Sequence, residues 1–303
     1  MMTALRVLSA CVLFASLLFA QPTITKVEKL PLDQSQEWSH PQFSPDGQKI
    51  YFTTVNGNGI WEYSVKTQSA RQITNDPQSG AAFSISPDGR QIAYRRTFTD
   101  TKTRQRTQEI VLQDLSTNLT SVVATGTDVS APVFSQDNVV FSVQGVANNL
   151  SKAQNTGIII ILGIENTKIL LNKNGQKLLL DPFSNGSYVW PVLSPDKTTI
   201  VAYEMDRGAF VCDLGGKILA TLGRRDAPSW TRTGKWIIYM NDKDDGHQIL
   251  SSDLHYIAPD GRQSGQLTFT FDIIEMYPQC SPTENNIVYC SLEGEIFLAS
   301  YTE

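Results

Sequence analysis

The string Ser-Pro-Asp-Gly occurs at residues 44–47, returns at residues 86–89, and is followed by four looser copies. The six copies begin at Ser44, Ser86, Ser135, Ser194, Thr231 and Ser281. Successive copies are 37 to 59 residues apart, about 47 on average, and cover nearly the whole chain. A period of this length constrains the fold strongly, because each copy must belong to one unit of a repeated architecture.

The string itself has the composition of a tight turn. Pro45 fixes the backbone at the second turn position, Gly47 accepts a left-handed conformation, and the side chains of Ser44 and Asp46 can bond the turn backbone. A catalytic group would be needed once, whereas the turn returns six times. The repetition therefore indicates a structural hairpin and removes Ser44 and Asp46 from the candidate catalytic residues.

Strand-like segments surround every turn. An apolar run precedes it, and a run with period-two alternation follows it, as in residues 49–53 and 236–240. Most units then add a third and a fourth short strand, as in residues 59–65 and 70–74. Four short antiparallel strands per repeat are typical of a propeller blade. The sequence therefore predicts an all-β, six-bladed β-propeller of four-stranded antiparallel blades over residues 21–303.

Three further details follow from the repeat. The residue before each turn should lie in the layers between blades; these residues are Phe43, Ile85, Phe134, Leu193, Trp230 and Cys280. The last unit contains only three strands, so we predict that residues 23–31 supply its outer strand and close the ring. The long insert at 142–190 contains the apolar run 157–164, which we predict to be a fully buried strand.

The N-terminus resembles an export signal. Arg6 precedes an apolar run from Val7 to Ala20, which is short for a membrane span of about 20 residues. We predict a signal peptide at residues 1–20, cleaved after Ala20, and a periplasmic or secreted protein. Two alternatives stay open: residues 8–11 resemble a lipobox that would anchor Cys11, and the apolar run could remain as an uncleaved anchor.

Three cysteines remain after removal of the signal peptide: Cys212, Cys280 and Cys290. An odd number allows at most one disulfide within the chain, and their spacing does not suggest zinc. We expect all three to be small buried apolar residues.

The turn pattern Pro-x-Phe-Ser-Pro-Asp-Gly, together with the downstream strands, resembles the repeat of TolB-type propellers. The resemblance covers about residues 22–303, without the N-terminal α/β domain through which TolB contacts its machinery. Related propellers occur in prolyl-oligopeptidase-type peptidases and oligogalacturonate lyases. The first need a Gly-x-Ser-x-Gly string, which is missing here, and the second hold a metal with several histidines. His40, His247 and His255 do not suggest such a site.

An acidic segment at residues 241–253 is one candidate site. Its ligand-binding candidates are Asp242, Asp244, Asp245, His247 and Asp253. Carboxylates in this number can hold a divalent cation or a polar ligand. Asp and Gly are also what a hairpin turn requires, and the spacing is not that of an EF-hand.

A basic segment at residues 94–109 is a second candidate. It contains Arg95, Arg96, Lys102, Arg104 and Arg106. On a chain of net charge −5, such a loop could steer an anionic partner, or it could be an ordinary solvated hairpin.

The sequence shows no nucleophile–base arrangement, metal cluster or nucleotide loop, and its acidity argues against nucleic acid. We therefore predict a monomeric, non-catalytic propeller without a cofactor. It would bind another envelope or secreted protein in the bacterial envelope. The alternative is a carbohydrate- or metal-binding enzyme, a lyase or hydrolase, whose loops at the channel mouth supply two carboxylates as acid and base.

Overall fold

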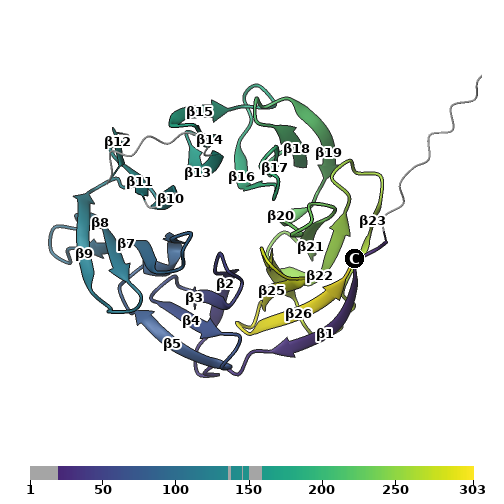
Figure 1. The fold of residues 1–303 in the computed structure, drawn as a ribbon, viewed down its shortest axis with the longest axis horizontal. Helices are drawn as coiled ribbons and strands as arrows, with labels where there is room; N and C mark the ends of the chain where they lie inside the picture. Colours follow the sequence, from purple (N-terminus) through teal and green to yellow (C-terminus); the bar gives the residue numbers. More distant parts are fainter. Residues whose placement is uncertain (1–19, 136–137, 145, 150–158) are drawn as a thin grey trace, which may run out of the picture.

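The computed structural model describes residues 20–135, 138–144, 146–149 and 159–303; the predicted signal peptide lies outside them except for Ala20. The described chain forms twenty-six β-strands and one short 3₁₀ turn, η1 (Ser79–Ala81). These strands make seven antiparallel sheets that follow one another around a ring (Figure 1). The predicted all-β propeller is confirmed.

Each sheet is one blade, and we number the blades in chain order. Blade 1 consists of β2 (Trp38–Phe43), β3 (Lys49–Thr54), β4 (Ile60–Ser64) and β5 (Ser69–Thr74), and blade 2 of β6 (Phe83–Ile85), β7 (Gln91–Thr99), β8 (Arg106–Asp114) and β9 (Thr120–Gly126). Blade 3 consists of β10 (Val133–Ser135), β11 (Asn138–Val143) and β12 (Val146–Asn149), and blade 4 of β13 (Ile159–Glu165), β14 (Lys168–Lys173) and β15 (Gln176–Leu180). Blade 5 consists of β16 (Tyr188–Leu193), β17 (Thr199–Glu204), β18 (Gly208–Asp213) and β19 (Ile218–Gly223), and blade 6 of β20 (Asp226–Trp230), β21 (Ile237–Asp244), β22 (Ile249–Ile257) and β23 (Ser264–Gln266). Blade 7 consists of β24 (Glu275–Cys280), β25 (Asn286–Ser291), β26 (Ile296–Thr302) and β1 (Thr23–Lys29).

The ring closes through its two ends. β1 pairs antiparallel with β26, from Thr23 opposite Thr302 to Lys29 opposite Phe297, and so supplies the fourth strand of blade 7. In Figure 1 the purple β1 lies directly along the yellow β26. The predicted closing strand is confirmed.

The number of blades needs one correction. Six blades each contain one copy of the repeated turn between their first two strands, as predicted. The seventh, blade 4, lies in the long insert, and its first turn uses Asn166 and Thr167, both with positive φ, in place of the repeated string. The described ring therefore holds seven sheets, because counting turns misses a blade that lacks the turn.

The strand predicted at residues 157–164 is β13, of which residues 159–165 are described. It is half-exposed rather than fully buried. The physical reason is its position: Ile161, Leu162 and Gly163 lie on the wall of the central channel.

The repeated turn is held by its own side chains. In blade 1 the Ser44 hydroxyl donates to Asp46 Oδ1 over 2.5 Å and accepts the Lys49 amide over 3.0 Å, while Gly47 takes a φ of 70°. Ser86 and Asp88 repeat the hydroxyl–carboxylate bond at 2.6 Å. Because these contacts satisfy the turn internally, they confirm a structural role for the repeat.

Apolar layers between adjacent blades form the core. Phe43, Phe134, Trp230 and Cys280 are buried in these layers, and Ile85 and Leu193 are half-buried at equivalent positions, as the repeat predicts. Cys212, Cys280 and Cys290 are buried free thiols, as expected.

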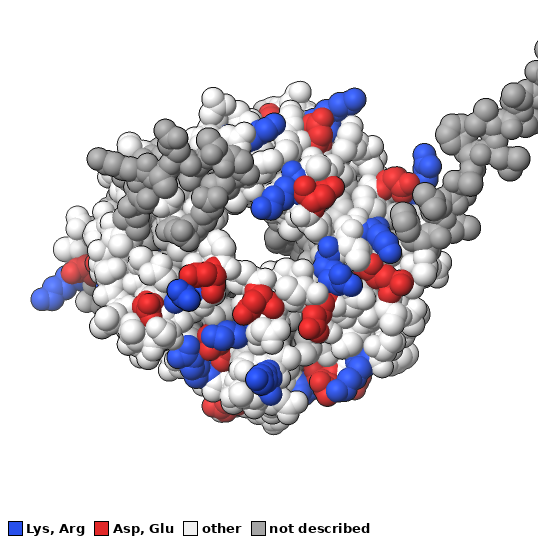
Figure 2. Space-filling view, in the orientation of Figure 1, with Lys and Arg blue, Asp and Glu red and all other residues white. Residues whose placement is uncertain are grey.

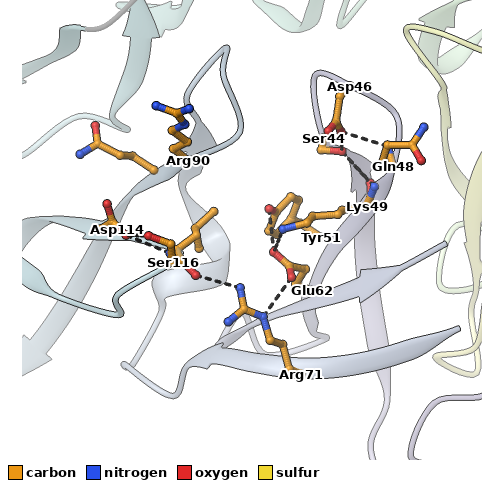
Figure 3. A network of polar contacts seen from close by, with 12 residues as sticks. Ser44, Asp46, Gln48, Lys49, Tyr51, Glu62, Arg71, Arg90, Asp114 and Ser116 are labelled. Atoms are coloured by element: carbon orange, nitrogen blue, oxygen red, sulfur yellow. Dashed lines mark hydrogen bonds and ion pairs between the residues drawn. The ribbon is translucent and has the colours of Figure 1, made fainter. Parts of the chain in front are cut away.

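An ionic network centred on the buried Glu62 links blade 1 to blade 2 (Figure 3). Glu62 on β4 accepts hydrogen bonds from Lys49 Nζ (3.0 Å), Tyr51 Oη (2.9 Å) and Arg71 Nε (2.9 Å). Arg71 also donates to the carbonyl of Leu115 in blade 2 over 3.1 Å. The network joins three strands of one blade to its neighbour.

The antiparallel topology gives the ring two different faces. One carries the repeated turns, and we call it the turn face. The opposite one carries the loops between the second and third strands and the links between blades; we call it the loop face.

Candidate functional site

A central channel runs through the ring and encloses about 870 Å³. Residues from the first strand, or the segment just before it, of all seven blades line its wall. Figure 2 shows the opening on one face, with Lys and Arg interspersed among Asp and Glu around it. Every described blade therefore contributes to this concave surface.

Four successive blades, 5, 6, 7 and 1, share a backbone irregularity on the channel wall. In each, the residue before a proline has a φ of about 50°, and the strand register shifts at that point; these residues are Trp190, Ala227, Tyr277 and His40. A left-handed conformation is uncommon for residues with a Cβ, and a bulge re-aims the side chain. The shared irregularity therefore fixes which side chains line the channel.

Three of these four residues carry rings. His40 stacks on Tyr277 with ring centroids 4.4 Å apart, and Trp190 packs edge-on against Tyr203 at 5.7 Å. Trp190 keeps 39% of its surface exposed. Ala227 stands in the blade between Trp190 and Tyr277, so a small side chain separates two aromatic ones on the wall.

A charged cluster lies beside Ala227 on the loop face. Arg224, in the link before β20, contacts three carboxylates: Asp226 at 3.3 Å, Asp242 at 2.9 Å and Asp244 at 2.8 Å. The Asp242 side chain is only 7% exposed. Its Oδ2 bonds Arg224, while its Oδ1 is buried without a hydrogen-bond partner in the described part of the chain.

The environment of the cluster shifts its acidities. Burial, together with the neighbouring Asp242, raises the pKa of Asp226 to about 6. The hydrogen bond from Arg224 lowers the pKa of Asp244, and its carboxylate partners raise the pKa of Arg224. The cluster therefore holds a carboxyl group that titrates close to neutral pH.

The structure divides the predicted acidic site. Asp242 and Asp244 both form ion pairs with Arg224. Asp245 instead accepts the backbone amides of His247 and Gln248, both over 2.9 Å, and so shapes its own hairpin turn. Asp253 accepts Gln266 Nε2 and the Thr270 amide, both over 3.0 Å, and shapes the link to blade 7. A ligand-binding role for these five residues stays a prediction.

The basic segment is also divided. Arg95 donates to the Val129 carbonyl over 2.6 Å, and Arg96 bridges Asp76 (3.1 Å) and Glu109 (2.7 Å). These two arginines already have partners within the fold. The exposed cations of the β7–β8 hairpin are Lys102, Arg104 and Arg106. Only these three can serve the predicted anionic partner directly.

An apolar patch lies on the loop face of blades 6 and 7. We define it by four exposed side chains: Leu250, Phe269, Phe271 and Leu292. Leu250 is three residues before Asp253, which bonds the Thr270 amide between the two phenylalanines. Leu292 donates its amide to the Ile274 carbonyl over 2.9 Å, at the end of the same link.

Among the described residues, no group of three or more His, Cys, Asp or Glu side chains could hold a metal ion. In the same residues, no helix is long and apolar enough to cross a membrane.

Sequence reasoning missed Arg224, Asp226, the channel rings and the phenylalanines. One signal was present: the residue before the proline of a repeat is aromatic or His in three copies, at His40, Trp190 and Tyr277. A second was the string Arg-Arg-Asp at 224–226, directly before the fifth repeat.

The ring and its channel define the class of protein: a closed antiparallel β-propeller. No family model and no curated protein matches the sequence.

Solved structures are similar in fold. A chain of the mitotic checkpoint complex matches with a TM-score of 0.62 and 10% identity over 99% of each chain. The β-propeller domain of Cps50 (Swd1) from Myceliophteria thermophila matches with a TM-score of 0.56 and 13% identity, over 93% of this chain and 100% of that domain. TolB from Acinetobacter baumannii matches with a TM-score of 0.50 and 18% identity over 77% of this chain, which spans about half (54%) of the TolB chain. At these identities the similarity shows the propeller fold alone.

Proposed function

We propose that the protein is an exported, non-catalytic propeller that binds another protein on its loop face in the bacterial envelope. The observation that carries this proposal is the apolar patch of blades 6 and 7. Phe269 and Phe271 are 79% and 107% exposed, so both rings stand in solvent. Exposed apolar clusters of this kind mark interaction surfaces on soluble proteins.

The patch is presented by an ordered link. Thr270, between the two phenylalanines, is held at both ends: its amide donates to Asp253 and its hydroxyl to the Ile273 carbonyl over 3.1 Å. A loop that is already ordered loses little conformational entropy on binding. More of the free energy gained by burying its apolar side chains therefore contributes to affinity. Burying both rings contributes about 3–5 kcal/mol.

Export is supported by the sequence of residues 1–20, with its single basic residue, its short apolar run and Ala20 before Gln21. N-terminal sequencing of the protein purified from an envelope fraction tests this part of the proposal. A chain that begins at Gln21 is expected. A blocked, lipid-modified Cys11 would favour the anchored form, and recovery only from the cytosol would refute export.

Binding is tested by affinity purification of the full chain from the native envelope, with co-purifying proteins identified by mass spectrometry. The test variant is Phe269→Ser/Phe271→Ser. The matched control is Leu119→Ser, which removes a 73% exposed leucine from the β8–β9 turn on the turn face. We expect the double variant to bind its main partner with an affinity lower by about 100-fold or more, and the control to bind it as the wild type does. Equal recovery by both variants would refute the role of the patch.

A further inference from the structure

We propose that the recess over Ala227, between Trp190 and Tyr277 at the loop-face mouth of the channel, binds an organic cation, an ammonium or guanidinium group. The recess is distinct from the apolar patch, and the inference does not depend on the patch. Its walls come from three successive blades, 5, 6 and 7. Trp190, Ala227 and Tyr277 occupy equivalent bulge positions in these blades, and all three line the channel.

The side-chain sizes create the recess. The bulge positions on both sides carry large rings, whereas the middle one carries only a methyl group. Tyr277 is supported from behind by the stacked His40, and Trp190 is supported by Tyr203. These contacts limit the movement of both rings, and a cation is attracted to aromatic faces.

Two carboxylates of blade 6, Asp226 and Asp242, lie near the recess and share Arg224. Asp226 is the residue next to Ala227, and after burial its charge is the largest influence that raises the pKa of Tyr203 behind Trp190. Burial, with charges that include Asp242, raises the pKa of Tyr277 on the other side. Both carboxylates are therefore close enough to the ring supports to act electrostatically at the recess.

The cluster has more negative than positive charge. Arg224 alone contacts three carboxylates, and Arg225 turns away to lie over the Tyr239 ring at 4.9 Å. Asp242 Oδ1, on a side chain more than nine-tenths buried, accepts no hydrogen bond from the described residues. A carboxylate oxygen without a donor keeps its negative potential, which a nearby cation would complement.

The test uses four probes with tryptophan fluorescence and NMR titration of the full-length protein. They are N-acetyl-lysine amide, N-acetyl-arginine amide, the uncharged N-acetyl-norleucine amide and methylammonium chloride. We expect millimolar dissociation constants for the lysine and arginine probes and about tenfold weaker binding of the norleucine probe. Methylammonium separates the sources of the cation. Equal affinity shows that a free amine suffices, and weaker affinity points to a side chain of a peptide; both outcomes support the recess.

The variants are Trp190→Leu, which removes a partly exposed ring, and Asp242→Asn, which removes one charge at constant size. Each should weaken lysine-probe binding about fivefold or more, while the control Leu119→Ser, on the turn face, should stay within about twofold. Thermal unfolding confirms that the variants fold, and if Asp242→Asn does not fold, Trp190→Leu carries the test. The proposal is overturned by no saturation at about 50 mM probe, by equal binding of norleucine, or by unchanged affinity in Trp190→Leu.

Discussion

The Glu62 network makes a quantitative prediction about stability. Replacing Glu62 by alanine removes the acceptor shared by Tyr51, Lys49 and Arg71. These three donors differ in their access to water. The Tyr51 side chain is fully buried, whereas Lys49 and Arg71 are exposed by about a third or more and can rotate into solvent.

The magnitude follows from that difference. A buried hydroxyl left without a partner costs about 1–3 kcal/mol. The two partly exposed cations each lose about 0–1 kcal/mol. We therefore expect Glu62→Ala to lower the free energy of unfolding by about 1–5 kcal/mol, equivalent to about 2–15 °C in Tm for a chain of this size.

Urea titration followed by tryptophan fluorescence and circular dichroism measures the loss. Glu62→Gln keeps an acceptor for Tyr51 and should lose less than Glu62→Ala. Glu28→Ala, at an exposed ion pair with Lys26, should stay within about 0.5 kcal/mol. In a double-mutant cycle, Tyr51→Phe should remove about 1 kcal/mol or more of the Glu62→Ala effect. A Glu62→Ala loss no larger than that of the Glu28 control would refute the reasoning.

Acidity offers a second check on the same residue. Burial alone would raise the pKa of Glu62, but the hydrogen bonds from Arg71, Lys49 and Tyr51 outweigh burial and lower it from its ordinary value of 4.5. The stabilisation by the carboxylate is therefore complete above that value and is lost as the pH falls below it. The stability difference between wild type and Glu62→Gln should shrink in the same range.

Three further predictions concern closure, acidity and thiols. Deleting residues 22–31 removes β1 and the buried Leu30, and should lower Tm by more than about 10 °C in calorimetry; an unchanged Tm would rule out closure by β1. Burial and Asp242 raise the pKa of Asp226 from 3.8 to about 6. The protonated carboxyl therefore contributes to the free energy of unfolding fully below pH 3.8, and this contribution is lost as the pH rises through 6. Relative to Asp226→Asn, the wild type should lose about 1–3 kcal/mol between about pH 4 and 7 in urea titrations, and a constant difference would contradict this. Burial raises the pKa of Cys212 and Cys280 to about 12 and of Cys290 to about 11, so a thiol reagent at about pH 8 should label none of them before denaturant is added; labelling in the native state would refute their burial.

Most of the fold was predictable because one local feature repeats. Turn chemistry is encoded within four residues, so each intact copy reports one hairpin, as Ser44 and Asp46 show. Blade 4 was not predicted because its first turn lacks that string. Asn166 and Thr167 form this turn in left-handed backbone conformations. A turn that can be built from several residue types leaves no fixed pattern to count.

The candidate site was predictable only in part, because it is assembled from segments that are local in space and separate in sequence. Asp242 and Asp244 were predicted as candidate ligand-binding residues because they are close together in the sequence. Asp226 and Arg224 join them only because the link before β20 lies beside the β21–β22 hairpin. The left-handed conformations of Trp190 and Tyr277 have no signature in residue type, since such conformations are uncommon for any aromatic residue.

The two faces of the ring differ in how far their own contacts satisfy their polar and apolar groups. The repeated turns on the turn face close the first two strands of their blades, and in three of them a Ser–Asp bond satisfies the turn internally, at Ser44, Ser86 and Ser194. A surface that is satisfied by its own bonds has little left to offer a partner. On the loop face, by contrast, the fold leaves Phe269 and Phe271 in solvent and one Asp242 oxygen without a donor among the described residues. The exposed apolar rings and this carboxylate oxygen both lie on the loop face. We therefore place both proposed binding sites on that face.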